Sequence, residues 1–193
     1  MLQNLQKYHI ILASNSPRRR ELLSGLGIHF DVQVLPGIDE SYPAFLPAER
    51  IAQYVAHKKA EAYQSMTGSD DLIITADTVV VCEGEVMGKP ADAADARRML
   101  RKLSGKTHQV VTGVCLATKT ALRQFSVSTD VTFKTLADEE IDYYIGTYRP
   151  FDKAGAYGIQ EWIGYIGVTG LKGSYYNVMG LPVQRIYAEL SKL

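Results

Sequence analysis

The sequence predicts an α/β protein, with a β-sheet flanked by helices. Residues 72–82 form an almost continuous apolar run rich in β-branched side chains, which is typical of a strand covered on both faces. Residues 47–66 instead repeat their apolar side chains at helical spacing. The length of 193 residues suits one domain over 1–193 with a full core, either undivided or as two lobes.

The chain begins with a predicted strand at residues 8–13, which leads into a predicted helix from Pro17 to Gly25. Ser16 is a good N-cap residue and proline is favoured in the first helical turn. Three arginines at 18–20 occupy that turn. Free backbone N–H groups and guanidinium groups together favour a phosphate site there. A solvated basic turn is the alternative.

Residues 28–35 are predicted to form a second strand. The turn that follows, at 36–41, carries Asp39 and Glu40. Either acid could ligate a metal ion, although such a pair in a loop is usually only solvated. Asp39 and Glu40 are therefore weak candidates until other charged residues are found beside them.

The helix predicted at 47–66 places Lys59 on its apolar face, while Lys58 lies one position away. A lysine in an apolar stripe either extends along the surface to reach water or contacts an anion in a cleft. Lys58 is at the position where a solvated lysine is expected.

Asp77 interrupts the apolar strand at 72–82. Burying an ionised carboxylate costs several kcal/mol unless cations or hydrogen-bond donors compensate. A turn at residues 83–84 would set Cys82 opposite Glu85 and bring Lys89 opposite Thr78, close to the aspartate. The pair is then either a structural ion pair or a metal-binding or general-base carboxylate beside a phosphate-binding lysine.

The second half of the chain predicts further sheet and helix. We expect a helix at 91–103, neighbouring strands at 107–118 and 125–133, a helix at 138–147 and a closing helix at 181–190. The glycine-rich stretch at 149–180 predicts tight turns between short strands. Its polar residues of interest are Asp152, Lys153, Gln160 and Lys172.

Composition excludes several classes of protein. The formal net charge is zero, which argues against nucleic acid or an anionic membrane as partner. Two cysteines without a CxxC pair, no leader-like segment and no apolar run of membrane-spanning length predict a cytoplasmic location.

Motifs exclude several chemistries. Residues 84–90 only superficially resemble a phosphate loop, and the four histidines lack metal-ligand spacing. Carboxylates together with cations instead suit Mg²⁺ or Mn²⁺ and a polyphosphate.

Four motifs resemble the Maf family along essentially the whole chain. They are I-L-A-S-N-S-P-R-R-R-E-L-L at 11–23, A-D-T-V-V-V with G-K-P at 76–90, D-K-A-G-A-Y-G-I-Q at 152–160 and G-S-Y-Y-N-V-M-G-L-P at 173–182. The resemblance implies a metal-dependent nucleotide pyrophosphatase, often a homodimer. It also implies an elongated mixed α/β fold shared with inosine-triphosphatase-like enzymes, with the site in a central cleft.

S-P-R-R, A-D-T and Y-G-I-Q resemble the dTTP/UTP pyrophosphatase branch of that family. The resemblance implies that Asp77 is the proton acceptor, that Asp77 and Glu40 hold the metal, and that Arg18, Thr78 and Gln160 set specificity. Arg19, Glu40, Lys59 and Lys89 match positions that line the family's site. The rival interpretations are a regulatory binding protein linked to septum formation and a purine triphosphate pyrophosphatase.

Overall fold

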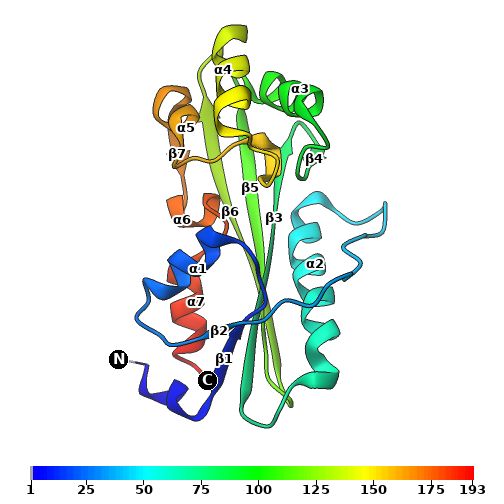
Figure 1. The fold of residues 1–193 in the computed structure, drawn as a ribbon, viewed down its shortest axis with the longest axis vertical. Helices are drawn as coiled ribbons and strands as arrows, with labels where there is room; N and C mark the ends of the chain where they lie inside the picture. The colour runs from blue at the N-terminus through cyan, green and yellow to red at the C-terminus, as the bar shows by residue number, and fades with distance from the viewer. Residues whose placement is uncertain (1) are drawn as a thin grey trace. The chain divides into compact units, whose positions relative to one another are not determined.

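The computed structural model describes residues 2–193 and contains one mixed sheet (Figure 1). In the described chain the sheet has seven strands in the order β2-β1-β3-β5-β6-β7, with β4 paired to β3. β1 is parallel to both β2 and β3, whereas β4 and β7 run antiparallel to β3 and β6. The strands are β1 (His9–Leu12), β2 (Asp31–Val32), β3 (Asp71–Cys82), β4 (Glu85–Met87), β5 (Thr107–Ala117), β6 (Leu122–Phe133) and β7 (Val168–Lys172).

Helices and short 3-10 turns flank the sheet. The α-helices are α1 (Pro17–Ser24), α2 (Ala48–Tyr63), α3 (Ala93–Leu103), α4 (Asp138–Tyr148), α5 (Trp162–Gly167), α6 (Tyr175–Val178) and α7 (Val183–Leu190). The 3-10 turns are η1 (Gln3–Lys7), η2 (Gln64–Met66) and η3 (Ala154–Ala156). Within residues 2–193, no helix combines the length and the apolar character needed to cross a bilayer.

The chain divides into two compact units. The first unit contains the described part of Met1–Asp77 together with Thr112–Val127 and Gly180–Leu193. The second unit contains Thr78–Val111 and Ser128–Met179. Since the division falls within β3, β5 and β6, each of these strands contributes residues to both units.

In the first unit, α2 covers one face of the strands and α1 and α7 lie on the other (Figure 1). The apolar stripe predicted for α2 is buried at Ile51, Ala52 and Val55. A Cβ at Gly113 of β5 would collide with the backbone of Ala52, so glycine allows α2 to approach the strand closely. The Thr75 hydroxyl of β3 donates to the carbonyl of Ala56 at 2.6 Å, which also fixes α2 on the sheet.

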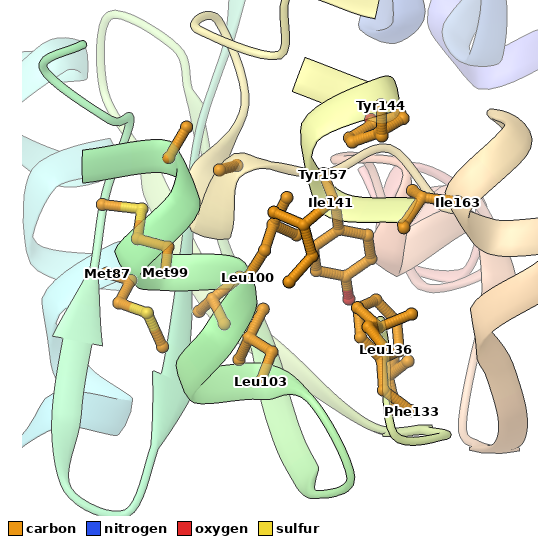
Figure 2. Packing of buried hydrophobic residues seen from close by; sticks show 14 of the residues in the cluster. Met87, Met99, Leu100, Leu103, Phe133, Leu136, Ile141, Tyr144, Tyr157 and Ile163 are labelled. Carbon is orange, nitrogen blue, oxygen red and sulfur yellow. The ribbon is translucent and has the colours of Figure 1, made fainter. Parts of the chain in front are cut away.

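In the second unit, a hydrophobic core forms around α3, α4 and the segment that follows α4 (Figure 2). Tyr157 lies among its aliphatic side chains, and its ring meets the edge of Phe133 at a centroid distance of 4.9 Å. The Tyr157 hydroxyl hydrogen-bonds to His108 Nε2 at 2.8 Å. This core holds the polar residues of the glycine-rich segment in place.

Most predicted elements are confirmed. The turn after β3 pairs Cys82 with Glu85 as expected, and Ser16 caps α1 by accepting from the Arg19 N–H. The strand predicted at 28–35 is wrong in length, because only Asp31–Val32 pairs with β1 and both residues are exposed. Beyond these two residues the stretch is not a strand, although Leu35 still packs against the core cluster of Ile11, Tyr63 and Ile73.

Two other predictions are wrong. Residues 149–180 contain one strand, β7, whereas α5 and α6 are helical. The pairing of Thr78 with Lys89 does not form, because β4 ends at Met87, opposite Val80. Gly88 instead accepts a hydrogen bond from the backbone N–H of Gly155 at 3.0 Å.

His108 is expected to make the free energy of unfolding depend on pH. Its side chain is 2% exposed, and burial lowers its pKa from 6.5 to about 4. The unfolded chain then binds the extra proton between pH 6.5 and 4, so stability falls as the pH falls through this window, by about 3 kcal/mol. In urea unfolding, the free energy of unfolding of His108→Gln should depend less steeply on pH in this window than that of the unmodified protein.

Candidate active site

Asp77 and Lys59 form an ion pair in the first unit. Lys59 Nζ donates to Asp77 Oδ1 at 2.9 Å, and the two side chains are only 13% and 16% exposed. The lysine extends from α2 and the aspartate ends the first unit's part of β3. The sequence predicted that a cation would compensate the charge of Asp77 in its apolar strand. Such a cation is present, but it is Lys59 rather than Lys89.

Glu40 lies at the same ammonium group. Its Oε1 is 3.1 Å from Lys59 Nζ, so one cation contacts two carboxylates. Contacts on either side of Glu40 hold its loop: the Tyr63 hydroxyl bonds the backbone at Gln33 and Leu35, and Lys58 Nζ donates to Asp39 at 2.8 Å. This explains how an exposed loop residue reaches the site.

Lys58 is more than the solvated residue that its position suggests. Besides Asp39, it donates to the carbonyl of Ser41 at 3.0 Å. Hydrogen bonds from Lys58 and Ser41 lower the pKa of the exposed Asp39 carboxyl. The Asp39–Lys58 pair thus fixes the two neighbours of Glu40, although solvent screens it.

Arg19 holds the backbone beside Asp77. Its Nε donates to the carbonyl of Gly180 and one terminal nitrogen to the carbonyl of Ala76, each at 2.9 Å. Burial lowers the pKa of this guanidinium from its usual value. Arg18 is half-buried, and its charge lowers the pKa of Arg19 further. The arginines that the sequence predicted to bind a phosphate therefore lie in the same unit as Asp77. Arg19 also anchors the backbone of Ala76, the residue before Asp77.

The second unit contains the other predicted residues. Thr78 is half-buried and directly follows Asp77, while Lys89 is exposed just after β4. The bond from Gly155 to Gly88 ties the chain before Lys89 to the segment that carries Gln160. Gly155 has a φ of +69°, and a Cβ there would lie 2.8 Å from the Val80 side chain, so glycine is required at this contact.

Gln160 is half-buried, and its Oε1 is buried with no hydrogen-bond partner among residues 2–193. A buried carbonyl oxygen without a donor costs free energy. The oxygen is not in contact with solvent in this structure, so the N–H group of a ligand reaches it only when the side chain turns. Beside Gln160 lie Glu161, Lys153 and Tyr144, which contact one another and which the sequence did not single out as a group.

The carboxylates of the first unit fit a magnesium or manganese ion. In the part of the chain that the structure describes, no group of three or more histidine, cysteine, aspartate or glutamate side chains could by itself hold a metal ion. Mg²⁺ usually takes only one or two carboxylates and completes its octahedron with water and substrate phosphates. Asp77 and Glu40, which meet at Lys59, supply such a pair.

Comparison with known proteins first defines the fold. The solved structure of a HAM1 protein from Coxiella burnetii matches with a TM-score of 0.51 at 14% identity, over 96% of this chain and all of that one. The chain is therefore an α/β protein with this mixed-sheet fold. In this chain, the Asp77–Lys59 pair lies beside a second carboxylate, that of Glu40.

The chain belongs to the Maf family: the model of the Maf-like protein matches residues 9–193. It is 67% identical over 193 residues to a dTTP/UTP pyrophosphatase from Phocaeicola vulgatus, with both chains covered completely. It is 57% identical, again over both full lengths, to a dTTP/UTP pyrophosphatase from Bacteroides thetaiotaomicron.

Proposed function

We propose that this protein is a nucleoside triphosphate pyrophosphatase that hydrolyses dTTP and UTP to the monophosphate and pyrophosphate. The observation that carries the proposal is the group formed by Asp77, Lys59 and Glu40, in a chain 67% identical to a relative of that name. By hydrolysing these triphosphates, the protein would act as a house-cleaning enzyme that removes them from the cellular nucleotide pool.

In the proposed reaction, water attacks the α-phosphorus and Asp77 takes its proton. The new bond joins the water oxygen to the α-phosphorus, and the bond from the α-phosphorus to the oxygen bridging to the β-phosphate breaks. Asp77 Oδ1 accepts from Lys59, so we assign the other carboxylate oxygen to the water. Lys59, Lys89 and Arg19 offset the charge that develops on the departing pyrophosphate. A bound Mg²⁺ or Mn²⁺ would supply electrophilic stabilisation of the phosphate oxygens.

The test is a panel of nucleotides with Mg²⁺, in which both products are identified. We expect dTTP and UTP to yield dTMP and UMP with pyrophosphate. Hydrolysis in H₂¹⁸O should place the label on the monophosphate, because the attack is at the α-phosphorus. Release of orthophosphate, preference for inosine or xanthosine triphosphate, or binding without turnover would each contradict the proposal and favour one of the rival functions.

The proposal extends to the setting in which the enzyme acts. We propose a cytoplasmic homodimer whose partner is the nucleotide, not nucleic acid or a membrane.

Gln160 is expected to select the base. Uracil and thymine present N3–H as a donor and O4 as an acceptor, whereas cytosine reverses both; an amide oxygen on N3–H and an amide nitrogen on O4 match the first pattern. Gln160→Ala should lower kcat/KM for UTP about 30-fold and narrow the preference over CTP, because polar pairing discriminates strongly. Steady-state kinetics on both nucleotides measures this effect. Gln109→Ala, at an exposed position of β5, is the control. If the unmodified protein used UTP and CTP equally, Gln160 would not be the residue that selects the base.

Lys59 and Lys58 are expected to differ strongly although they are neighbours on α2. Lys59→Ala removes the cation shared by Asp77 and Glu40, and we expect kcat/KM for UTP to fall about 100-fold. Lys58→Ala removes a solvent-screened pair with Asp39, so the expected loss is below about threefold. Kinetics of the two variants under one set of conditions compares them. A larger loss at Lys58 would mean that positioning of the Glu40 loop matters more than the shared charge.

A further inference from the structure

A buried chain of polar contacts joins three residues of the second unit. Lys153 is 8% exposed, and its Nζ lies 3.0 Å from Glu161 Oε1 and 2.8 Å from Asp152 Oδ1. Glu161 Oε2 accepts a hydrogen bond from the Tyr144 hydroxyl. That hydroxyl in turn accepts from the backbone N–H of Gly158 at 3.0 Å.

These contacts depend on one another. Tyr144 is fully buried in the core with Ile141 and Ile163 (Figure 2), so its hydroxyl has a fixed place. A buried ammonium and its carboxylate are tolerated only when both are paired and hydrogen-bonded. Loss of one member leaves the others with uncompensated charge or unmet hydrogen bonds. The chain of contacts therefore favours a single arrangement of the segment that it holds.

The segment that it holds contains Gln160. Tyr144 binds both Gly158 and Glu161, and the Glu161 N–H closes a turn by donating to the Gly158 carbonyl at 3.0 Å. Gln160 lies inside that turn. A Cβ at Gly158 would lie 3.1 Å from Gln160 Nε2 and 3.0 Å from Glu161 Cδ, so the amide rests against the glycine.

The Gln160 amide oxygen itself has no hydrogen bond to hold it. Oε1 is buried and lacks a partner within residues 2–193. Because the oxygen makes no hydrogen bond, the groups packed around the amide contribute to its orientation. The surroundings are Gly158 and Glu161, which the Tyr144 hydroxyl fixes in place.

We propose that Tyr144, Glu161 and Lys153 are positioning residues that set the Gln160 amide for pairing with the N3–H and O4 edge of a pyrimidine base. The inference rests on the proposed function, because it assigns these residues a part in base selection. They do not touch the nucleotide. They restrain the segment from Gly158 to Glu161, so that the amide can distinguish uracil from cytosine.

Tyr144→Phe tests the proposal, because it removes only the hydroxyl that binds both ends of the segment. We expect kcat/KM for UTP to fall about tenfold, mainly through KM, and the UTP-to-CTP preference to shrink about fivefold. Tyr148→Phe is the matched control: it lies on the same helix and stacks on Tyr144 at a centroid distance of 5.2 Å, but its side chain is 37% exposed. A merely structural role would lower the melting temperature and leave the preference unchanged.

A second measurement does not need activity. The side-chain amide signals of Gln160 in a ¹H–¹⁵N spectrum, assigned by their loss in Gln160→Ala, should move in Tyr144→Phe and in Lys153→Met but not in Tyr148→Phe. If the Tyr144→Phe variant does not fold, Lys153→Met serves as the test variant in its place. The Gly158 N–H should exchange faster in Tyr144→Phe, since its acceptor is gone.

The outcomes separate the two proposals. If the unmodified protein does not hydrolyse UTP, the proposed function is wrong. The positioning inference is then tested by the Gln160 signals alone. Hydrolysis with a UTP preference that Tyr144→Phe and Lys153→Met both retain overturns the positioning inference alone. Unmoved Gln160 signals in both variants overturn it as well.

Discussion

Asp77→Asn is expected to lower kcat on dTTP and UTP by about 10³- to 10⁴-fold with little change in stability. The amide keeps the size of the side chain and can still accept from Lys59, which lies 2.9 Å from Oδ1 in the unmodified protein. It cannot take a proton from water, and it lacks the charge that a metal ion requires. Single-turnover kinetics with dTTP measures the chemical step directly.

The control for Asp77→Asn is Asp70→Asn, which makes the same change at an exposed residue just before β3. Its activity should match that of the unmodified protein. Circular dichroism and the melting temperature should be alike in all three proteins. Near-normal turnover by the Asp77 variant would remove the proposed general base and leave the carboxylate with the structural role of an ion-pair partner for Lys59.

Sequence periodicity predicted those site residues whose placement depends on a single helix or strand. Lys59 falls on the apolar face of α2 beside Val55, and this local pattern left two outcomes, extension to water or contact with an anion, of which the structure shows the second. Asp77 was recognised because a continuous apolar strand has no packing reason to carry a carboxylate. Both residues are found together because the helix that carries one packs directly on the strand that carries the other.

Contacts between distant segments could not be predicted in the same way. The hairpin register pointed to Lys89 as the partner of Asp77, but β4 ends at Met87, where Gly88 turns to bond Gly155. Glu40 was a weak candidate from its acidic turn and from the family resemblance, because its place at Lys59 depends on contacts that hold an exposed loop.

The glycine-rich stretch was misread for a related reason. Its glycines suggested tight turns between short strands with close backbone approaches; the close approach is present at Gly155 against Val80, but α5 and α6 are helices. Tyr144 and Glu161 come from segments 17 residues apart, and nothing in the local pattern of either indicates their contact. The sequence singled out Lys153 only as a polar residue of this stretch, and its contacts with Asp152 and Glu161 emerge from the fold.

Removal of the divalent metal is expected to abolish activity, and Mg²⁺ or Mn²⁺ should restore it. Asp77 and Glu40 share a single ammonium, that of Lys59, so the cluster retains net negative charge. Two donor nitrogens of Arg19 are already bound to carbonyl oxygens. The charge of Arg19 also acts on both carboxylates, but a triphosphate brings several further negative charges, which a divalent cation would offset. Pyrophosphate release should therefore fall to background in EDTA and recover when the metal is added in excess.

Glu40→Gln tests whether this carboxylate binds the metal. Because the variant loses one charged ligand, the Mg²⁺ concentration for half-maximal activity should rise about tenfold, while kcat at saturating metal stays within a few-fold of the original. Glu49→Gln, an exposed acid in the first turn of α2, should leave the metal requirement unchanged. If Glu40→Gln lowers kcat but not the apparent metal affinity, Glu40 acts through Lys59 and not as a ligand. Full activity of the unmodified enzyme in EDTA would eliminate the metal from the mechanism and leave Lys59, Lys89 and the arginines as the cations that bind the triphosphate.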